Sequence, residues 1–364
     1  MRFPEFTEEW KAEQLDNIAT LSKGIGISKE QLSEDGDPCI LYGELYTKYK
    51  SEIIKQVESK TDIDGSKLKR SKANDVIIPC SGETAVDIAT ARCVPFDSIL
   101  LGGDLNVISL HKYDGAFMSY QLNGKRKYDI ARVAQGVSVV HLYGEHLKTI
   151  KTYNPTLPEQ QKIAILLSLL DERIATQNKI IDKLQSLIKG IAQNIVSNNK
   201  PNIRLSDCLD CSSSTLQESD VCETGIYPVY GANGIVGYLD NYNTEGEAVY
   251  IIKDGSGVGT VSYATGKCSA TGTLNTLQAK DGYSLQYLYY ILKVFNFEPY
   301  KTGMAIPHIY FKDYGKAKIF CPSYTEQLRY ARLQSAIDSK LSVEKNILTS
   351  LSSQKQYLLR QMFI

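Results

Sequence analysis

The chain has 364 residues, enough for two or three domains, and its 43% hydrophobic and 23% charged residues are ordinary for a soluble globular protein. Its 41 basic and 41 acidic residues cancel, which argues against a stand-alone nucleic-acid-binding protein, because such proteins are usually basic. The longest apolar run, 163–170, is too short to span a membrane, and residues 1–9 lack the apolar core of a signal peptide. We therefore expect a cytoplasmic protein.

The 8 cysteines are scattered along the chain, and we expect them to be reduced in the cytosol. Only Cys208 and Cys211 form a C-x-x-C pair, and zinc would need a second such pair or nearby histidines. We therefore predict partly buried thiols and no metal site.

Residues 1–155 are predicted to form a first globular domain. A short apolar-periodic segment around Leu15 precedes predicted strands at 38–43, 75–79 and 98–106. The turn at 124–127 is basic, and a basic patch of this kind is usually a solvated loop.

Residues 156–199 are predicted to form one long helix. Thr156 and Glu159 have the spacing of a capping box, in which a hydroxyl and a carboxylate each satisfy a free backbone N–H. Apolar residues then recur at alternating intervals of four and three, the period of a coiled coil. The predicted helix-pairing residues here are Ile163, Leu167, Leu170, Ile174, Gln177, Ile181 and Leu184.

Residues 200–322 are predicted to form a second globular domain that loosely repeats the first. The sequence pairs Tyr230 with Tyr42, and the pair Asn233–Gly234 suits the type I′ turn of a hairpin. The glycines of 248–259 could suggest a nucleotide-binding loop. A strand-like alternation follows them where such a loop needs a helix, so we predict a strand, a turn and a strand.

Residues 323–364 are predicted to form a second long helix, and they repeat residues 156–197 at a fixed offset of 167 residues. Gln160 matches Gln327 at this offset, and His141 matches His308. The predicted helix-pairing residues of the second helix are Ile337, Leu341, Glu344, Leu348 and Leu351.

This second helix has polar residues in its apolar seam, at Gln334, Glu344 and Lys355, which puts even packing along it in doubt. No P-loop, no H-E-x-x-H and no G-x-S-x-G occurs in the chain, and neither does the Asn-Pro-Pro-aromatic tetrapeptide of amino-methyltransferases. We therefore predict a protein without catalytic residues.

Two divergent domains, each followed by a related long helix, resemble the specificity subunit of type I restriction–modification systems. The resemblance covers the whole chain. It lies in the opening segment with Trp10, in the helix entry Leu-Pro-Glu-Gln-Gln161 with its Glu-Gln repeat at 326–327, and in the block 230–237. Gly-x-x-x-x-His segments at 136–141 and 303–308 lie where that family ends its recognition domains.

The resemblance implies an α+β fold. Two mixed α/β target-recognition domains, 1–155 and 200–322, would be joined by spacer helices 156–199 and 323–364 that pair as an antiparallel coiled coil. In such a pair Gln177 and Glu344, which are equivalent, are predicted to lie close together and to fix the register.

The resemblance also implies partners. Each domain would read one half of a split site in double-stranded DNA, and two modification subunits would dock on the helices. Those subunits would bind S-adenosylmethionine and methylate adenine, and restriction subunits that use ATP and Mg²⁺ would join them. This chain would bind no cofactor. Partners that supply most phosphate contacts would explain its neutral charge.

Base contacts need side chains that reach the groove edges, chiefly polar and basic residues on loops. In the first domain the candidates are Tyr42, Glu44, Ser81, Glu83, Lys125, Arg126 and Lys127. In the second they are Tyr230, Asn233, Lys253, Asp254, Ser256 and Lys301.

Two other kinds of protein fit the same sequence. One is a coiled-coil scaffold that presents two ligand- or protein-binding domains without DNA. The other is an enzyme with an unrecognised site in the glycine turns of the second domain. A neighbouring methyltransferase gene would favour the recognition subunit, and a turnover assay would test the enzyme.

Overall fold

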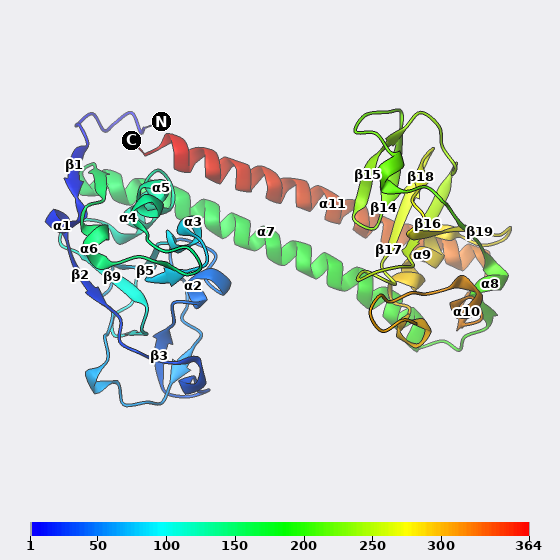
Figure 1. Cartoon of the computed structure of the whole chain (residues 1–364), viewed down its shortest axis with the longest axis horizontal. Coiled ribbons are helices and arrows are strands. Elements are labelled where there is room, and N and C mark those ends of the chain that lie inside the picture. The colour runs from blue at the N-terminus through cyan, green and yellow to red at the C-terminus, as the bar shows by residue number, and fades with distance from the viewer. Residues whose placement is uncertain (1, 364) are drawn as a thin grey trace. The chain divides into compact units, whose positions relative to one another are not determined.

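The computed structural model describes residues 2–363, which form two compact units (Figure 1). Unit 1 contains the residues up to 178 and those from 347 onward, and unit 2 is Lys179–Asn346. Each unit therefore holds one globular domain together with one half of each long helix.

The main sheet of unit 1 is antiparallel, with strand order β2-β9-β5-β7. One of its two inner strands, β5 (Asp75–Pro79), confirms the predicted strand and is buried along its whole length. Val76 and Ile78 pack on one face, against the cluster around Leu15, and Ile77 packs on the other. This alternation is the period of two that a strand imposes on its side chains.

The remaining elements of unit 1 include the other three strands of this sheet. The other strands of unit 1 are β1 (Lys11–Gln14), β2 (Ala19–Lys23), β3 (Asp37–Ile40), β4 (Lys60–Thr61), β6 (Ser81–Gly82), β7 (Arg92–Val94), β8 (Leu100–Leu101), β9 (Leu105–Leu110), β10 (Val140–His141) and β11 (Lys151–Asn154). Its short helices are α1 (Leu15–Ile18), α2 (Glu44–Thr47), α3 (Ala85–Ile88), α4 (Gly115–Asn123), α5 (Lys127–Val133) and α6 (Gly144–Lys148), with 3₁₀ turns at Lys29–Gln31 and Gly65–Lys67.

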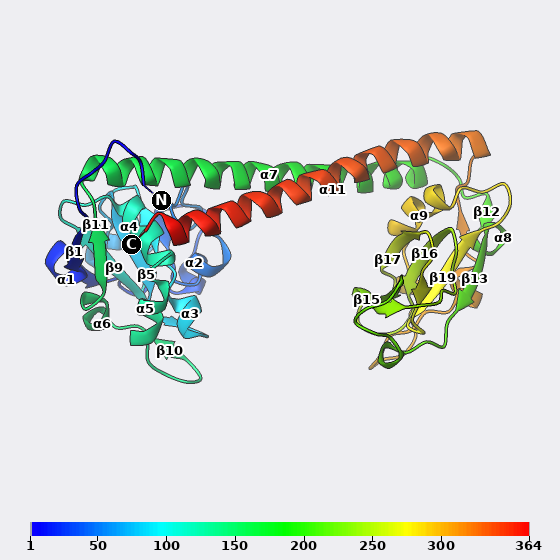
Figure 2. The same cartoon turned by 90° about the horizontal axis from the view of Figure 1, so that it is seen from above.

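Unit 2 repeats this plan with the main sheet β13-β19-β16-β17. Its strands are β12 (Ile203–Arg204), β13 (Leu209–Ser213), β14 (Tyr227–Gly231), β15 (Gly234–Leu239), β16 (Glu247–Ile252), β17 (Val261–Thr265), β18 (Ser269–Ala270), β19 (Leu274–Ala279) and β20 (Lys318–Ile319). Its short helices are α8 (Leu205–Cys208), α9 (Leu285–Lys293) and α10 (Phe311–Tyr314), with 3₁₀ turns at Glu218–Asp220 and Glu298–Tyr300. In Figure 2, α9 lies between the sheet and the long helices.

The glycine-rich segment 248–259 forms strand β16 and the turn before β17, as predicted. The hairpin β14–β15 is also present, but the predicted type I′ turn is wrong. That turn needs a positive φ at both central residues, and here Gly234 has φ +99° while Asn233 does not have a positive φ.

The predicted pairing of Tyr42 with Tyr230 is wrong by two residues. Ile40 pairs with Leu101 in the parallel ladder β3–β8, and Tyr230 occupies the matching place in the ladder β14–β18. The carbonyl of Ile40 accepts from the N–H of Gly102 at 2.9 Å, and that of Tyr230 accepts from Thr271 at 2.9 Å. Tyr230 is therefore the equivalent of Ile40.

The long helices are α7 (Leu157–Ser197) and α11 (Tyr324–Gln361), each unbroken (Figure 1). In unit 1 the start of α7, with Ile163, packs with the end of α11, with Met362. In unit 2 the end of α7, with Ile195, packs with the start of α11, with Ala331. The two helices therefore run antiparallel, as expected.

All of the predicted helix-pairing residues are buried or half-buried. Gln177 and Glu344 are both buried, and their mutual contact stays a prediction. Gln334 is fully buried, and its Nε2 donates to the carbonyl of Ile188 at 3.3 Å. The polar residue is thus accommodated by the backbone of the facing helix.

The Glu-Gln pair that opens each long helix anchors it to its domain. Gln160 accepts from the N–H of Asp114, the N-cap of α4, at 2.9 Å, and donates to the carbonyl of Pro155 at 2.8 Å. Gln327 makes the equivalent pair of bonds in unit 2, one of them from Ser284, the N-cap of α9, at 2.9 Å.

The predicted capping box at Thr156 is wrong. Glu159 is buried and accepts two hydrogen bonds from Arg2, each of 2.7 Å, and one from Trp10 at 3.3 Å. The carboxylate therefore ties the N-terminal segment to α7. In the second copy Ser323 and Glu326 have the same spacing, and the N–H of Ser323 donates to the carboxylate of Glu326 at 3.3 Å, which is one of the two hydrogen bonds of a capping box.

Within residues 2–363, no helix is both long and apolar enough to cross a membrane.

Candidate nucleic-acid interface

In unit 2, two segments far apart in sequence meet at the end of β16. The carbonyl of Lys253 accepts from the N–H of Ile309 at 2.9 Å, and Asp254 forms a backbone bridge with His308. The side chains of this bridge also join, because Nδ1 of His308 lies 2.6 Å from Oδ1 of Asp254. A carboxylate and an imidazole are thus held in fixed positions at the surface.

This junction borders an open groove of about 560 Å³. The ammonium of Lys312 lies 5.3 Å from the centre of the Tyr310 ring, within the range of a cation–π contact. The lining residues are Cys211, Ser213, Lys253, Asp254, Asn275, His308, Tyr310, Phe311 and Lys312. The groove offers donors, acceptors and aromatic faces of the kind that contact base edges and phosphates.

Unit 1 has the equivalent backbone hydrogen bonds at this place, but different side chains. The carbonyl of Cys80 accepts from the N–H of Leu142 at 2.8 Å, and Ser81 pairs with His141 across β6 and β10. Ser81 therefore stands where unit 2 has Asp254. At the neighbouring strand end, Lys23 pairs with Asn106 as Ser213 pairs with Asn275 in unit 2.

Three of the predicted site residues therefore lie at equivalent sheet ends, Ser81 in unit 1 and Lys253 and Asp254 in unit 2. Ser256 is exposed in the turn that follows Asp254, and Lys301 forms an ion pair of 2.6 Å with Glu298.

The other candidates lie elsewhere. Tyr42 and Glu83 are exposed on the turns before α2 and α3, and Asn233 is exposed in the hairpin. Tyr230 is half-buried, with its ring centre 5.3 Å from that of Tyr250. The turn that carries Lys125 and Lys127 packs at Gly124 against the end of α11.

Two candidates, Glu44 and Arg126, are corrected by the structure. Glu44 is 6% exposed, and its carboxylate accepts from the N–H of Leu41 at 2.9 Å and pairs with Lys48 at 2.7 Å. Arg126 lies 5.1 Å from the centre of the Tyr153 ring and is mostly buried. Both side chains stabilise the fold, so we withdraw them as base contacts.

Sequence reasoning missed several residues of this interface. They are Lys23, His141 and Tyr143 in unit 1 and Ser213, His308, Tyr310 and Lys312 in unit 2. A signal was present, since the offset of 167 residues relates both the two histidines and the two tyrosines.

Burial keeps the two thiols of the C-x-x-C pair protonated. All eight cysteines are free, and burial raises the pKa of Cys208 to about 12 and that of Cys211 to about 11. Such thiols hold little of the reactive thiolate. In the part of the chain that the structure describes, no three His, Cys, Asp or Glu side chains lie close enough together to hold a metal ion.

A family model described as "Type I restriction modification DNA specificity domain" matches residues 7–186 and again residues 201–353. The two matches cover both domains and most of both long helices.

Individual relatives agree with this match. The chain is 28% identical over 117 residues to the EcoprrI type I specificity subunit of Escherichia coli, a segment that spans 32% of this chain and 29% of that subunit. It is 25% identical over 287 residues to a protein of Mycoplasma genitalium that carries the name of a type I specificity subunit, covering 71% and 73% of the two chains.

Solved structures show the same fold. The S subunit of a type I restriction–modification system from M. genitalium aligns with a TM-score of 0.70 at 19% identity, covering 100% of this chain and 97% of the other. A chain from a study of complex assembly and conformational transition in the type I R-M system aligns with a TM-score of 0.55 at 15% identity, covering 97% of each chain.

Proposed function

This chain belongs to the type I restriction–modification DNA specificity family, and on that premise we propose that it recognises a split site in double-stranded DNA. Residues 1–155 read one half-site and residues 200–322 read the other. The observation that carries the proposal is that the same backbone pairing occurs at the end of the main sheet in both units. The backbone bridges Ser81–His141 and Asp254–His308 are equivalent, while the side chains around them differ. Two such surfaces suit two half-sites that share duplex geometry and differ in sequence.

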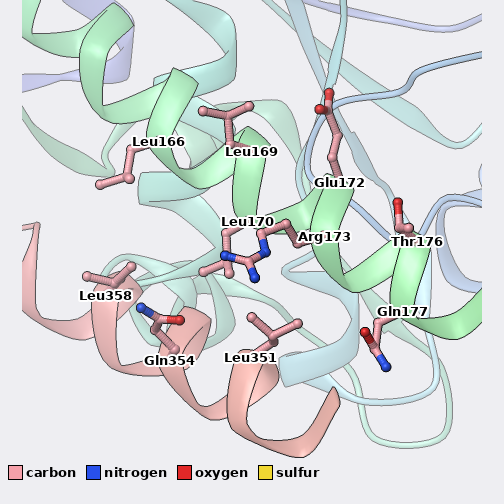
Figure 3. Close-up of a pocket in the computed structure, with 10 residues that line it drawn as sticks. All are labelled: Leu166, Leu169, Leu170, Glu172, Arg173, Thr176, Gln177, Leu351, Gln354 and Leu358. Atoms are coloured by element: carbon pink, nitrogen blue, oxygen red, sulfur yellow. The ribbon is translucent and has the colours of Figure 1, made fainter. Parts of the chain in front are cut away.

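The long helices then serve as the dock for two modification subunits. In unit 1 an open groove of about 660 Å³ runs between α7 and α11. Figure 3 shows the residues that line it, among them Leu166 and Leu169 of α7 and Leu358 and Gln354 of α11. Leu333, the equivalent of Leu166, is likewise exposed in unit 2. An exposed leucine at the same position in two copies of one helix favours two identical partners.

Chemistry in this assembly comes from the partners. The modification subunits bind S-adenosylmethionine, and restriction subunits bind ATP and Mg²⁺. The absence of any catalytic motif from the sequence supports this division. The neutral charge supports it too, because partners supply most of the phosphate contacts.

A domain exchange tests the proposal. Residues 200–322 are replaced by the second domain of a relative, and the methylated motif is read by methylome sequencing of a host that carries the modification subunits. We expect one half of the motif to change and the other half to stay. The reciprocal exchange of 1–155 should change the other half. A motif that changes in both halves after a single exchange would show that the domains do not read independently.

Replacing Lys253 with alanine tests the surface itself. We expect about a tenfold loss of methylation at cognate sites, with relaxed discrimination at one base of the half-site read by unit 2. Methylation rates on duplexes changed one base at a time measure this. Lys280→Ala is the matched control, since Lys280 follows the opposite end of β19 from the groove residue Asn275. Equal effects of the two variants would remove Lys253 from the interface.

A further inference from the structure

One hairpin in each unit projects from the interface. In unit 1 Gln135 and His141 exchange two backbone hydrogen bonds, of 2.9 and 2.6 Å. In unit 2 Thr302 and His308 do the same, at 2.9 and 2.7 Å. The glycine that follows the first partner has φ +121° at Gly136 and +87° in its unit 2 equivalent. Any larger residue would be strained there, so the conformation of both turns requires glycine at this position.

The side chains at the tips of these hairpins are apolar and exposed to solvent. Val137 is 97% exposed and Met304 is 106% exposed, and each is followed two residues later by another exposed apolar side chain, Val139 or Ile306. A single exposed apolar residue is common on protein surfaces. The same two positions are apolar and exposed in both domains, although the domains have diverged around them. This recurrence indicates that the two hairpin tips have the same role in both domains.

The base of each hairpin belongs to the interface. His308 closes its hairpin and pairs with Asp254, and the N–H of Gly255 donates to the carbonyl of Pro307 at 3.0 Å. His141 closes the other hairpin and pairs with Ser81. Figure 2 shows the β10 loop on the side of unit 1 opposite α7. The tips thus stand beside the surfaces proposed to read DNA.

We propose that the two tips are wedges that insert between neighbouring base pairs, one in each half-site. The proposal rests on the proposed function. Proteins that deform DNA place apolar side chains such as Met and Ile between base steps, where the side chain leaves water and the step is partly unstacked. The unstacked step also lowers the cost of extruding the base that a modification subunit must reach.

Size and surroundings favour DNA over a protein partner. A stable protein interface buries about 800 Å² on each partner, far more than two side chains on a turn provide. A base step needs only a wedge of one or two side chains. A basic group flanks each hairpin, Arg132 before the first and Lys301 at the base of the second, and each forms an ion pair with a carboxylate three residues away, Asp129 at 3.1 Å and Glu298 at 2.6 Å. The two basic groups match the phosphates on either side of the opened step.

The test uses the assembled complex of this chain with its modification subunits. Cognate duplexes carry 2-aminopurine at successive positions of each half-site, and its fluorescence rises where stacking is lost. With the wild-type chain we expect one unstacked step per half-site in addition to any extruded target base. Met304→Ser should abolish the signal and lower affinity about tenfold for the half-site read by 200–322 alone. Val137→Ser should act on the other half-site alone.

Ile226→Ser is the control, because Ile226 is an apolar side chain that is 68% exposed on another loop of the same domain. It should leave fluorescence and affinity unchanged. Tip variants that keep the signal and bind within twofold of the wild type would overturn the proposal. So would Met304→Ser if it weakened assembly with the modification subunits in the absence of DNA, since the tip would then contact protein. Failure of the proposed function would be seen separately, as a wild-type complex that does not select its site.

Discussion

Replacing Lys355 with methionine is expected to lower the free energy of unfolding of unit 1 by about 3–5 kcal/mol, the usual cost of removing one partner from a buried ion pair. The ammonium of Lys355 lies 2.6 Å from Oδ1 of Asp171 and 2.5 Å from Oε2 of Glu52. The three side chains are 15%, 5% and 8% exposed. Tyr120 donates to the other oxygen of Asp171 at 2.7 Å. Without the lysine two carboxylates remain buried beside each other.

This loss should depend on pH. Burial raises the pKa of Glu52, and the charge of Lys355 is the largest influence that opposes the rise. In Lys355→Met the folded-state pKa of Glu52 should therefore move further above its unfolded value of about 4.3. Stability linked to a raised carboxylate pKa is present below the unfolded value and is lost as the pH rises through the folded value. The variant should thus lie closest to the wild type in acid and fall behind it as the pH approaches 7.

Hydrogen exchange of the unit 1 amides measures the effect, because a protein of two units does not guarantee a single unfolding transition. Lys55→Met is the matched control in the same unit. Its ammonium pairs with Glu172 at 3.1 Å, and the two side chains are 51% and 56% exposed, so the expected loss is below about 1 kcal/mol. Adding Glu52→Gln and Asp171→Asn to Lys355→Met should recover part of the stability. Equal losses for the two lysine variants would show that the buried cluster is not held by charge.

Lys355 also shows what the sequence could not reveal. In the sequence it is a polar residue in an apolar seam and predicts uneven packing. In the structure its partner Glu52 lies 303 positions away, in a loop of the first domain, and the cluster joins that domain to α11. The equivalent position in the first helix is Ile188, so the repeat gave no hint of an ion pair. Helix periodicity reports the pairing face, whereas a contact across the fold depends on the tertiary structure.

Elsewhere in the fold and in the candidate interface, too, some features could be predicted from the sequence and others could not. Local pattern was sufficient for the strand 75–79, the turn after β16 and the two long helices, because each follows from periodicity and turn residues within a short window. It was insufficient for Glu44 and Arg126, whose type suggests exposure and whose burial depends on Lys48 and Tyr153. The two hairpins were visible as matching Gly-x-x-x-x-His segments, but their bare tips required the structure.

Adding one heptad to each long helix is expected to lengthen the gap between the two half-sites by about three base pairs. The insertions follow Gln177 and Glu344, which are equivalent positions of the seam. Seven residues preserve the period of the seam and add about 10 Å to each helix at about 1.5 Å per residue. At about 3.4 Å per base pair this length corresponds to three base pairs. The original site should then lose nearly all methylation.

Methylome sequencing of a host with the modification subunits measures the new motif. Each half-site should keep its sequence, because neither domain is altered, and only the number of unspecified bases between them should grow. A heptad inserted into one helix alone is the control, since it shifts one seam against the other and should abolish methylation at both the old and the new sites. A motif with its original gap after the double insertion would mean that α7 and α11 do not set the spacing, and that the domains are positioned by the modification subunits that bind them.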